Sequence, residues 1–516
     1  MINKRLIGGG IAAMLLALIT LPAAAQSFQV QCPTTTTTHP VAADVEPEYT
    51  DANGFNGAIK CQQISGGDGF ATMGDGTQTY MFSFGPLSGL HDMANGQPGT
   101  QFPGVFNTVA PALLPGDPAT ADGATGGLVY NQGTPGTFTY NGAVGLAPNA
   151  DSIANGSCAA PCLDGHVDPR PIMDVGVMNG NIPAPLMAID EDDEFFLTLT
   201  NVGQVMRPDL FEQHTVHFHG YPNASAFYDG VPDASVAINI GASFTYYYLS
   251  PDAGTYFWHC HITPPEHLQM GMVGQLYVRP RQNRVPNGVS LYSALQTQQG
   301  NLRTRCDSSD ILCSNPLPAV DTGATATGVK YAYNDGDGTT AYDVEIPLQI
   351  HGFDPNFHFV GMTFNPENFT GMKDKYFLLN GRSYPDTVTP GPIATQSTDG
   401  VMHYSQPLPA IITLTSGQKA LLRISDLDVT EYQTLASQGI PMTVIGYNAK
   451  LLRDQAGNNL YYKTNSITLA GGESLDVILD TTGIPAGTYY LYTPNLDHLS
   501  NDAENFGGLM TEVHVL

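Results

Sequence analysis

Residues 259–272 read His-Cys-His-Ile-Thr-Pro-Pro-Glu-His-Leu-Gln-Met-Gly-Met, and residues 214–220 upstream read His-Thr-Val-His-Phe-His-Gly. Together the two strings hold six of the 14 histidines of the chain. Two imidazoles, one thiolate and a distant thioether are the ligands of a blue copper centre. Any one of these side chains alone would be read as a core or strand-end residue. Their combination in this order favours a copper protein.

Strand geometry divides these side chains into two sets, because successive residues of a β-strand point to opposite faces. If both strings are extended, Cys260 points away from the two histidines that flank it. One face is then predicted to carry His214 and Cys260, with His267 and Met272 arriving from the following loop. The other face is predicted to carry His217, His219, His259 and His261. Peptide bonds of Cys260 would join the two sets.

At these residues the chain resembles the multicopper oxidases and their relatives, the copper nitrite reductases. The resemblance implies that His214, Cys260, His267 and Met272 bind a type 1 copper. It also implies that His217, His219, His259 and His261 form half of a type 2/type 3 copper cluster that reduces dioxygen. Cys260, His259 and His261 would then carry electrons between the sites. The second histidine of the type 1 set follows the cysteine by seven residues rather than the usual five, because Pro264 and Pro265 lengthen the loop.

The rest of the chain favours an all-β protein, because short runs rich in β-branched and aromatic residues alternate with glycine, proline and aspartate. Residues 180–190 and 377–386 resemble opening strands of cupredoxin domains, so we expect tandem cupredoxin-like Greek-key β-sandwich or barrel domains. The predicted organisation is a signal peptide (1–25), a Gly/Ala/Pro-rich extension (26–165), a copper-binding cupredoxin domain (166–284), a linker or insertion (285–344) and a second cupredoxin-like domain (345–516). Whether the extension belongs to the first domain stays open.

The second domain is predicted to lack type 1 copper ligands. Residues 253–261 align with residues 486–494, which place Tyr-Thr-Pro where the first copy has His-Cys-His. The family builds its trinuclear cluster from four His-x-His pairs, and this chain has two. His351 or His358 could contribute to a depleted cluster, although a solvent-facing or turn role is the favoured alternative, and His498 is expected to be structural. Two-domain members of the family form trimers, so a neighbouring subunit of a homotrimer could complete the cluster.

Export is predicted from the first 25 residues, in which Lys4 and Arg5 precede an apolar run that ends at Ala23-Ala24-Ala25. We therefore expect a periplasmic or extracellular protein without a membrane span. An oxidising compartment would permit disulfides among the cysteines other than Cys260, which are Cys32, Cys61, Cys158, Cys162, Cys306 and Cys313. The net charge of −28 opposes binding to nucleic acid.

Three functions are compatible with these patterns. The favoured one is an exported multicopper oxidase that takes electrons from a small reductant, a phenol or a metal ion, and passes them through Cys260 to dioxygen. The second is an electron-transfer or copper-binding protein with a degenerate cluster. The third is a nitrite-reductase-like enzyme, against which counts an aspartate that stands in that family where His217 stands here. A secreted β-protein without metal is the remaining alternative.

Overall fold

The computed structural model describes residues 37, 59–86, 146–148, 163–167, 180–204, 206–207, 210, 212–221, 225–240, 242–250, 252–284, 328–362, 368–396 and 402–516. The predicted signal peptide, much of the predicted extension and most of the predicted linker lie outside these residues. The six cysteines that were candidates for disulfides lie outside the described side chains. Among the described residues, no helix is both long and apolar enough to span a membrane.

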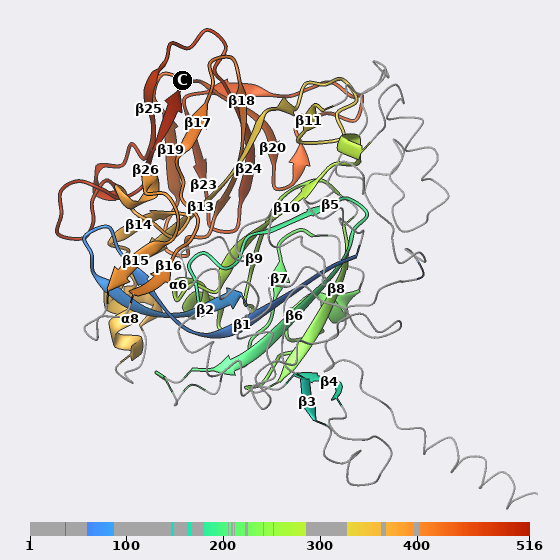
Figure 1. The fold of residues 1–516 in the computed structure, drawn as a ribbon, viewed down its shortest axis with the longest axis vertical. Helices are drawn as coiled ribbons and strands as arrows, with labels where there is room; N and C mark the ends of the chain where they lie inside the picture. The colour runs from blue at the N-terminus through green and yellow to red at the C-terminus, as the bar shows by residue number, and fades with distance from the viewer. Residues whose placement is uncertain are drawn as a thin grey trace, which may run out of the picture.

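The first structural unit is a sandwich of two four-stranded sheets (Figure 1). One sheet has the order β2-β1-β6-β8, with β1 (Ile59–Thr72), β2 (Gln78–Pro86), β6 (Glu194–Gly203) and β8 (Ser243–Leu249). The other has the order β5-β10-β9-β7, with β5 (Met187–Asp190), β10 (Val273–Arg279), β9 (Gly254–His259) and β7 (His217–Phe218). Both sheets mix parallel and antiparallel pairs, since β1 runs parallel to β6 and β5 parallel to β10.

Alternation along each strand explains why these sheets form a sandwich. Phe195, Leu197 and Leu199 of β6 point into the apolar core, which they share with Trp258 of the opposite sheet. On the outer face of β6, the hydroxyl groups of Thr198 and Thr245 lie 2.8 Å apart, as cross-strand hydrogen-bonding partners do. Each fully buried apolar side chain stabilises the fold by about 1.5–3 kcal/mol, so the core fixes which face of each strand points inward.

The second unit, drawn in orange and red in Figure 1, is also a two-sheet sandwich. Its larger sheet contains β14 (Tyr376–Leu379), β13 (Val344–Phe353), β18 (Lys419–Asp426), β24 (Ser474–Asp480), β20 (Met442–Tyr447), β21 (Lys450–Leu451) and β22 (Tyr462–Thr464). Its smaller sheet has the order β17 (Ile412–Leu414), β26 (Met510–Val515), β25 (Gly487–Tyr492), β19 (Gln433–Ser437) and β23 (Ser466–Leu469). The predicted all-β class is confirmed.

Short elements complete the described chain. Three two-stranded ribbons are formed by β3 (Leu146–Pro148) with β4 (Leu163–Val167), β11 (Lys330–Tyr331) with β12 (Ala341–Tyr342), and β15 (Ile393–Gln396) with β16 (Met402–Ser405). The helices are α6 (Pro264–Gln269), α8 (Pro355–Met362) and the 3-10 turns η5 (Ala226–Tyr228), η6 (Arg281–Arg284), η7 (Phe369–Gly371), η8 (Asp386–Val388) and η9 (Leu496–His498).

The segment expected to be a loop after Cys260 is a short helix, α6. Pro264 and Pro265 occupy its first positions, where a missing backbone N–H costs nothing and the fixed φ favours the helix. Thr263 precedes it with φ of 37°, and Gly271 follows it with φ of 114°. The two prolines therefore start a helix that carries His267, rather than merely lengthening a loop.

The β1–β2 hairpin lies within the stretch of sequence that was hardest to interpret. In the structure β1 pairs with β6 over most of its length, so this hairpin forms half of one sheet of the first unit. Because paired residues of β1 and β6, such as Ile59 and Glu194, are about 135 positions apart in the chain and the strands run parallel, no local turn signal marks their pairing.

Candidate metal centres

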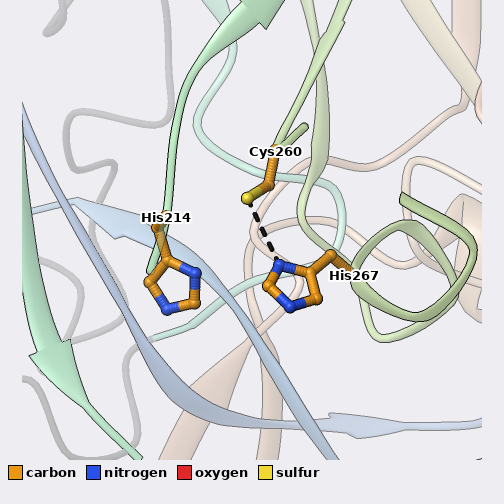
Figure 2. A group of neighbouring side chains, drawn as sticks. All are labelled: His214, Cys260 and His267. Atoms are coloured by element: carbon orange, nitrogen blue, oxygen red, sulfur yellow. Dashed lines mark hydrogen bonds between the residues drawn. The ribbon is translucent and has the colours of Figure 1, made fainter. Parts of the chain in front are cut away.

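The first candidate centre consists of His214, Cys260 and His267. His214 precedes β7, Cys260 directly follows β9, and His267 lies on α6. Their ligand atoms all lie within 4.8 Å of one another, and all three side chains are fully buried. The Cys260 sulfur is 3.2 Å from Nδ1 of His267, and Figure 2 shows the two imidazole rings beside this sulfur. The sequence therefore brings two imidazoles and one thiol to one point inside the first sandwich.

The polar atoms at this point lack the partners that buried groups normally have. Both ring nitrogens of His214, and Nε2 of His267, form no hydrogen bond. Burying polar atoms without hydrogen bonds is costly unless a ligand satisfies them. Burial lowers the pKa of His214 to about 3, so its ring is neutral and keeps a lone pair for a metal. The donor set therefore fits a metal ion.

The Cys260 thiol must lose its proton before its sulfur can bind a metal ion as a thiolate. Burial raises the pKa of its thiol to about 11, so at neutral pH an incoming metal ion must displace the proton. The backbone N–H of Thr215 donates a hydrogen bond to the sulfur at 3.4 Å, which partly stabilises the thiolate. A site with two imidazoles and one thiolate is the arrangement that favours copper among the common metals.

Met272 directly precedes β10 and lies opposite Cys260. The Cys260 N–H donates to the Met272 carbonyl at 3.1 Å, and the register pairs Val273 with His259. Directly opposite residues of an antiparallel pair point to the same face, so Met272 shares the face of Cys260. Its N–H also donates to the His267 carbonyl at 2.8 Å. Met272 is fully buried in the same core cluster as Cys260.

The second candidate centre is a group of four imidazoles on the opposite face of the same strands. His217 pairs with His259 across β7 and β9, which places both rings on one side of the sheet. Nitrogen atoms of His217, His219 and His259 lie within 4.8 Å of one another. The ring of His261 lies 5.1 Å from that of His217, centre to centre. The four side chains that sequence parity groups together are thus neighbours.

Hydrogen bonds orient these rings for metal binding. Nδ1 of His217 donates to the Asp229 carbonyl at 2.8 Å, and Nδ1 of His259 donates to the Cys260 carbonyl at 2.6 Å. Each bond leaves the Nε2 lone pair of its ring available, as in sites where a metal-binding histidine is held by its other nitrogen. Nε2 of His259 faces Nε2 of His219 at 2.9 Å. Burial lowers the pKa of His219 to about 4, so this ring is neutral at physiological pH.

The second unit approaches the four imidazoles without adding another. A methyl group placed on Gly472 would lie 2.9 Å from Nδ1 of His219, so the two units touch here. Among the described residues, neither group of candidate ligands includes a histidine of the second unit. A cavity of about 430 Å³ opens beside His219, and its walls are Phe257, Pro264, Pro265 and Leu268 of the first unit with residues 428–432 and 470–472 of the second.

Three histidines of the second unit, His351, His358 and His498, have protein partners. His351 and His358 are buried between the units and contact carbonyl groups of α6. The favoured prediction of a solvent-facing or turn role was therefore wrong for both. His498 stacks on Phe377 with ring centres 3.8 Å apart, and Nδ1 lies 2.9 Å from the Gln433 side-chain oxygen.

The structure also places residues at the first centre that no motif had marked. Gly66 of β1 lies directly against the ring of His214, and the edge of Phe82 of β2 meets the ring of His267 with centres 5.2 Å apart. The Ser83 hydroxyl donates to the Gly271 carbonyl at 2.5 Å. Gly66-Gly67 and the alternating Phe82 and Phe84 were the available signals, but they gave no indication of which element they would cover.

Two stretches of the chain match a known protein family. Two multicopper oxidase profiles match residues 165–283 and 363–511, and together they cover just over half of the chain. The chain belongs to the multicopper oxidase family. The resemblance seen in the two histidine strings is thus confirmed, and each matched stretch lies mainly within one of the two sandwiches of this multicopper oxidase homologue.

Individual relatives each match about a fifth of the chain. The laccase abr2 of Aspergillus fumigatus is 33% identical over 109 residues, which are 21% of this chain and 17% of the laccase. L-ascorbate oxidase of Cucumis sativus is 32% identical over 109 residues, 21% of this chain and 17% of that protein. A copper-containing nitrite reductase of Rhizobium meliloti is 33% identical over 109 residues, 20% of this chain and 26% of the reductase. The chain therefore matches only a minor part of each relative's length.

Proposed function

We propose that this protein is an exported copper oxidase that oxidises a small reductant, a phenol or a metal ion, and reduces dioxygen. The observation that supports the proposal best is the pair of donor sets on opposite faces of His259-Cys260-His261. We assign His214, Cys260, His267 and Met272 to the type 1 copper, and His217, His219, His259 and His261 to the dioxygen-reducing copper. Copper at the two sets would supply one-electron oxidation at the first and dioxygen reduction at the second.

The reductant would deliver its electrons without touching the first ligand set, because those side chains are fully buried. Nε2 of His267 lies 3.9 Å from a carboxylate oxygen of Glu212, whose side chain is 28% exposed. A reductant bound to Glu212 would therefore lie beside the edge of the His267 ring without direct contact, and its electrons could pass to that ring. A carboxylate at this position would suit either a metal cation or a phenol hydroxyl group.

Cys260 is the connection between the two sets. Its backbone joins it covalently to both neighbouring histidines, and its carbonyl also accepts the hydrogen bond from Nδ1 of His259 at 2.6 Å. Electrons leaving the sulfur therefore have a route of a few covalent bonds, with one short hydrogen bond, to the imidazole set. This is the physical reason to assign Cys260, His259 and His261 to electron transfer.

At the imidazole set, small molecules have access through the cavity beside His219. The set contains half of the imidazoles that the family's trinuclear cluster uses. We propose that the others come from a neighbouring copy, with a homotrimer as the assembly. The alternative function is electron transfer or copper binding with a degenerate cluster. It is favoured by one observation, which is that the described second unit offers no imidazole to the four that are present.

Counting copper distinguishes the two functions. The protein should be exported with its own leader, loaded with Cu(II), and measured for copper per chain, electron paramagnetic resonance and native mass. About four copper ions with both a blue and a normal signal, together with dioxygen uptake on adding a phenol, Fe(II) or Cu(I), would support the oxidase. A single blue copper without dioxygen uptake would support electron transfer, and absence of copper binding would exclude both. N-terminal sequencing of the exported protein tests cleavage after Ala25.

A further inference from the structure

The end of α6 is held by two histidines from the second unit. Leu268 and Gln269 directly follow His267 in the chain. Nε2 of His351, on β13, lies 3.0 Å from the Leu268 carbonyl. Nε2 of His358, on α8, lies 3.0 Å from the Gln269 carbonyl. The last carbonyl groups of a helix have no partner within it. The Gln269 carbonyl faces the His358 ring, whereas the Leu268 carbonyl faces the His351 ring and also accepts from the Gly271 N–H at 3.0 Å.

The Gln269 side chain adds two further attachments to the second unit. Its amide nitrogen donates to a carboxylate oxygen of Asp374 at 3.0 Å, and its amide oxygen accepts from the backbone N–H of Asp354 at 2.9 Å. Gln269 and His358 are fully buried. Helix α6 is therefore fixed by buried contacts from two segments of the second unit, residues 351–358 and Asp374.

His358 also touches the second element that packs on His267. Its Nδ1 lies 2.6 Å from the Tyr80 carbonyl of β2, and Phe82 of the same strand meets the His267 ring edge-on. The His358 ring stacks on Phe353 with centres 3.6 Å apart. Burial lowers the pKa of His358 to about 3, so the neutral ring carries one N–H and hydrogen-bonds to one of the two carbonyls at a time. The His358 side chain thus contacts both α6, which carries His267, and β2, which packs against the His267 ring.

We propose that His358 is a positioning residue that fixes His267 relative to Cys260. In this chain the second unit then acts on the first copper centre as a clamp, although none of its described residues is a candidate ligand there. The inference rests on the proposed copper site, and it assigns a role to a histidine that the site itself does not use. Groups that orient a metal ligand commonly change metal affinity about 10- to 100-fold when they are removed.

The test compares two buried, stacked histidines of the same unit. His358→Phe keeps an aromatic ring against Phe353 and removes both polar contacts. The control His498→Phe makes the same change at a ring that stacks on Phe377 and whose polar partners are Gln433 and Glu431. His358→Gln retains an N–H donor and should restore part of the loss. Cu(II) affinity, the visible thiolate-to-copper absorption and the reduction potential are measured on each holoprotein.

We expect His358→Phe to weaken Cu(II) binding about 10- to 100-fold and to shift both the absorption and the potential, while His498→Phe leaves all three unchanged. In the metal-free protein, His358→Phe should speed hydrogen exchange at the Met270 and Gly271 amides. Faster exchange with wild-type copper properties would overturn the positioning role, and so would equal losses in both variants. If His358→Phe does not fold, His351→Phe takes its place, with the same readouts and the same contrary results. If the wild-type protein binds no copper, the proposed function fails, whereas the exchange experiment still tests the clamp.

Discussion

Gly66 provides a test of whether the β1–β2 hairpin shapes the first centre. A methyl group at Gly66 would lie 2.6 Å from Cδ2 of His214 and 3.4 Å from its Nε2. Carbon atoms in van der Waals contact are about 3.5–4.0 Å apart, so in Gly66→Ala either the ring or the strand must move by roughly 1 Å. The nearest atom, Cδ2 of His214, belongs to the ring of a proposed copper ligand.

The magnitude follows from two opposing effects. Forcing an extra methyl group into a packed interior costs about 1–3 kcal/mol. Replacing glycine by alanine at a compatible backbone position returns about 0.4–1 kcal/mol by restricting the unfolded chain. Gly66→Ala should therefore destabilise the metal-free protein by about 1–2 kcal/mol. In the holoprotein, Cu(II) should bind about 10- to 100-fold more weakly, because a ligand ring has been displaced.

Gly487→Ala is the matched control, because a methyl group there would lie 3.8 Å from the Tyr489 ring, which is ordinary contact. This variant should be neutral or more stable by up to about 1 kcal/mol. Chemical unfolding of the metal-free proteins gives the stability difference, and competitive Cu(II) titration followed by the blue absorption gives the affinity. If Gly66→Ala matched the control in stability, affinity and spectrum, the close contact between Gly66 and His214 could not be correct.

Three further variants separate the parts of the site. Cys260→Ser should remove the blue absorption and electron transfer from the reductant while the four imidazoles still bind copper; retained oxidase turnover would exclude the proposed route. His217→Ala should do the reverse, keeping the blue absorption but losing dioxygen uptake, and an unchanged uptake would contradict it. Burial opposes ionisation of Glu345, but Arg279 and Arg423 hold its pKa below the ordinary value of 4.5. Its charge therefore stabilises the protein above that pH, and this contribution is lost as pH falls through the lower folded value. Glu345→Gln should cost about 3 kcal/mol at pH 7 and progressively less below about pH 4; a cost that did not shrink in acid would refute the ion-pair argument.

The division of ligands between two faces could be predicted from sequence, because it depends only on strand alternation. Cys260 points into the core with Trp258, while Phe257 and His259 point to the other face. The same rule placed His217 with His259. Such local regularities hold wherever the backbone is extended, and the structure needs no long-range information to satisfy them.

The surroundings of the site could not be predicted in the same way. Gly66 reaches His214 because β1 pairs in parallel with a strand far along the chain, and His358 reaches α6 from 89 residues away. Contacts of this kind depend on how whole elements pack, and single residues carry no signal for them. The Pro-Pro pair was misjudged for a related reason, since it is compatible with both a loop and the first turn of a helix.

The second unit has Tyr-Thr-Pro where the first has His-Cys-His, yet it is attached to the elements that carry the candidate copper ligands. At one end of β9, the Thr255 hydroxyl donates to the Asp476 carboxylate at 2.6 Å. The Thr255 backbone carbonyl accepts from the Ser474 hydroxyl at 2.5 Å. Beyond the other end of this strand, α6 is fixed by His351 and His358. The strand that leads into His259-Cys260-His261 and the helix that carries His267 are thus both attached to the second unit. A unit whose described residues include no candidate ligand can still determine the geometry of a metal site, because ligand positions are set by the elements that carry them.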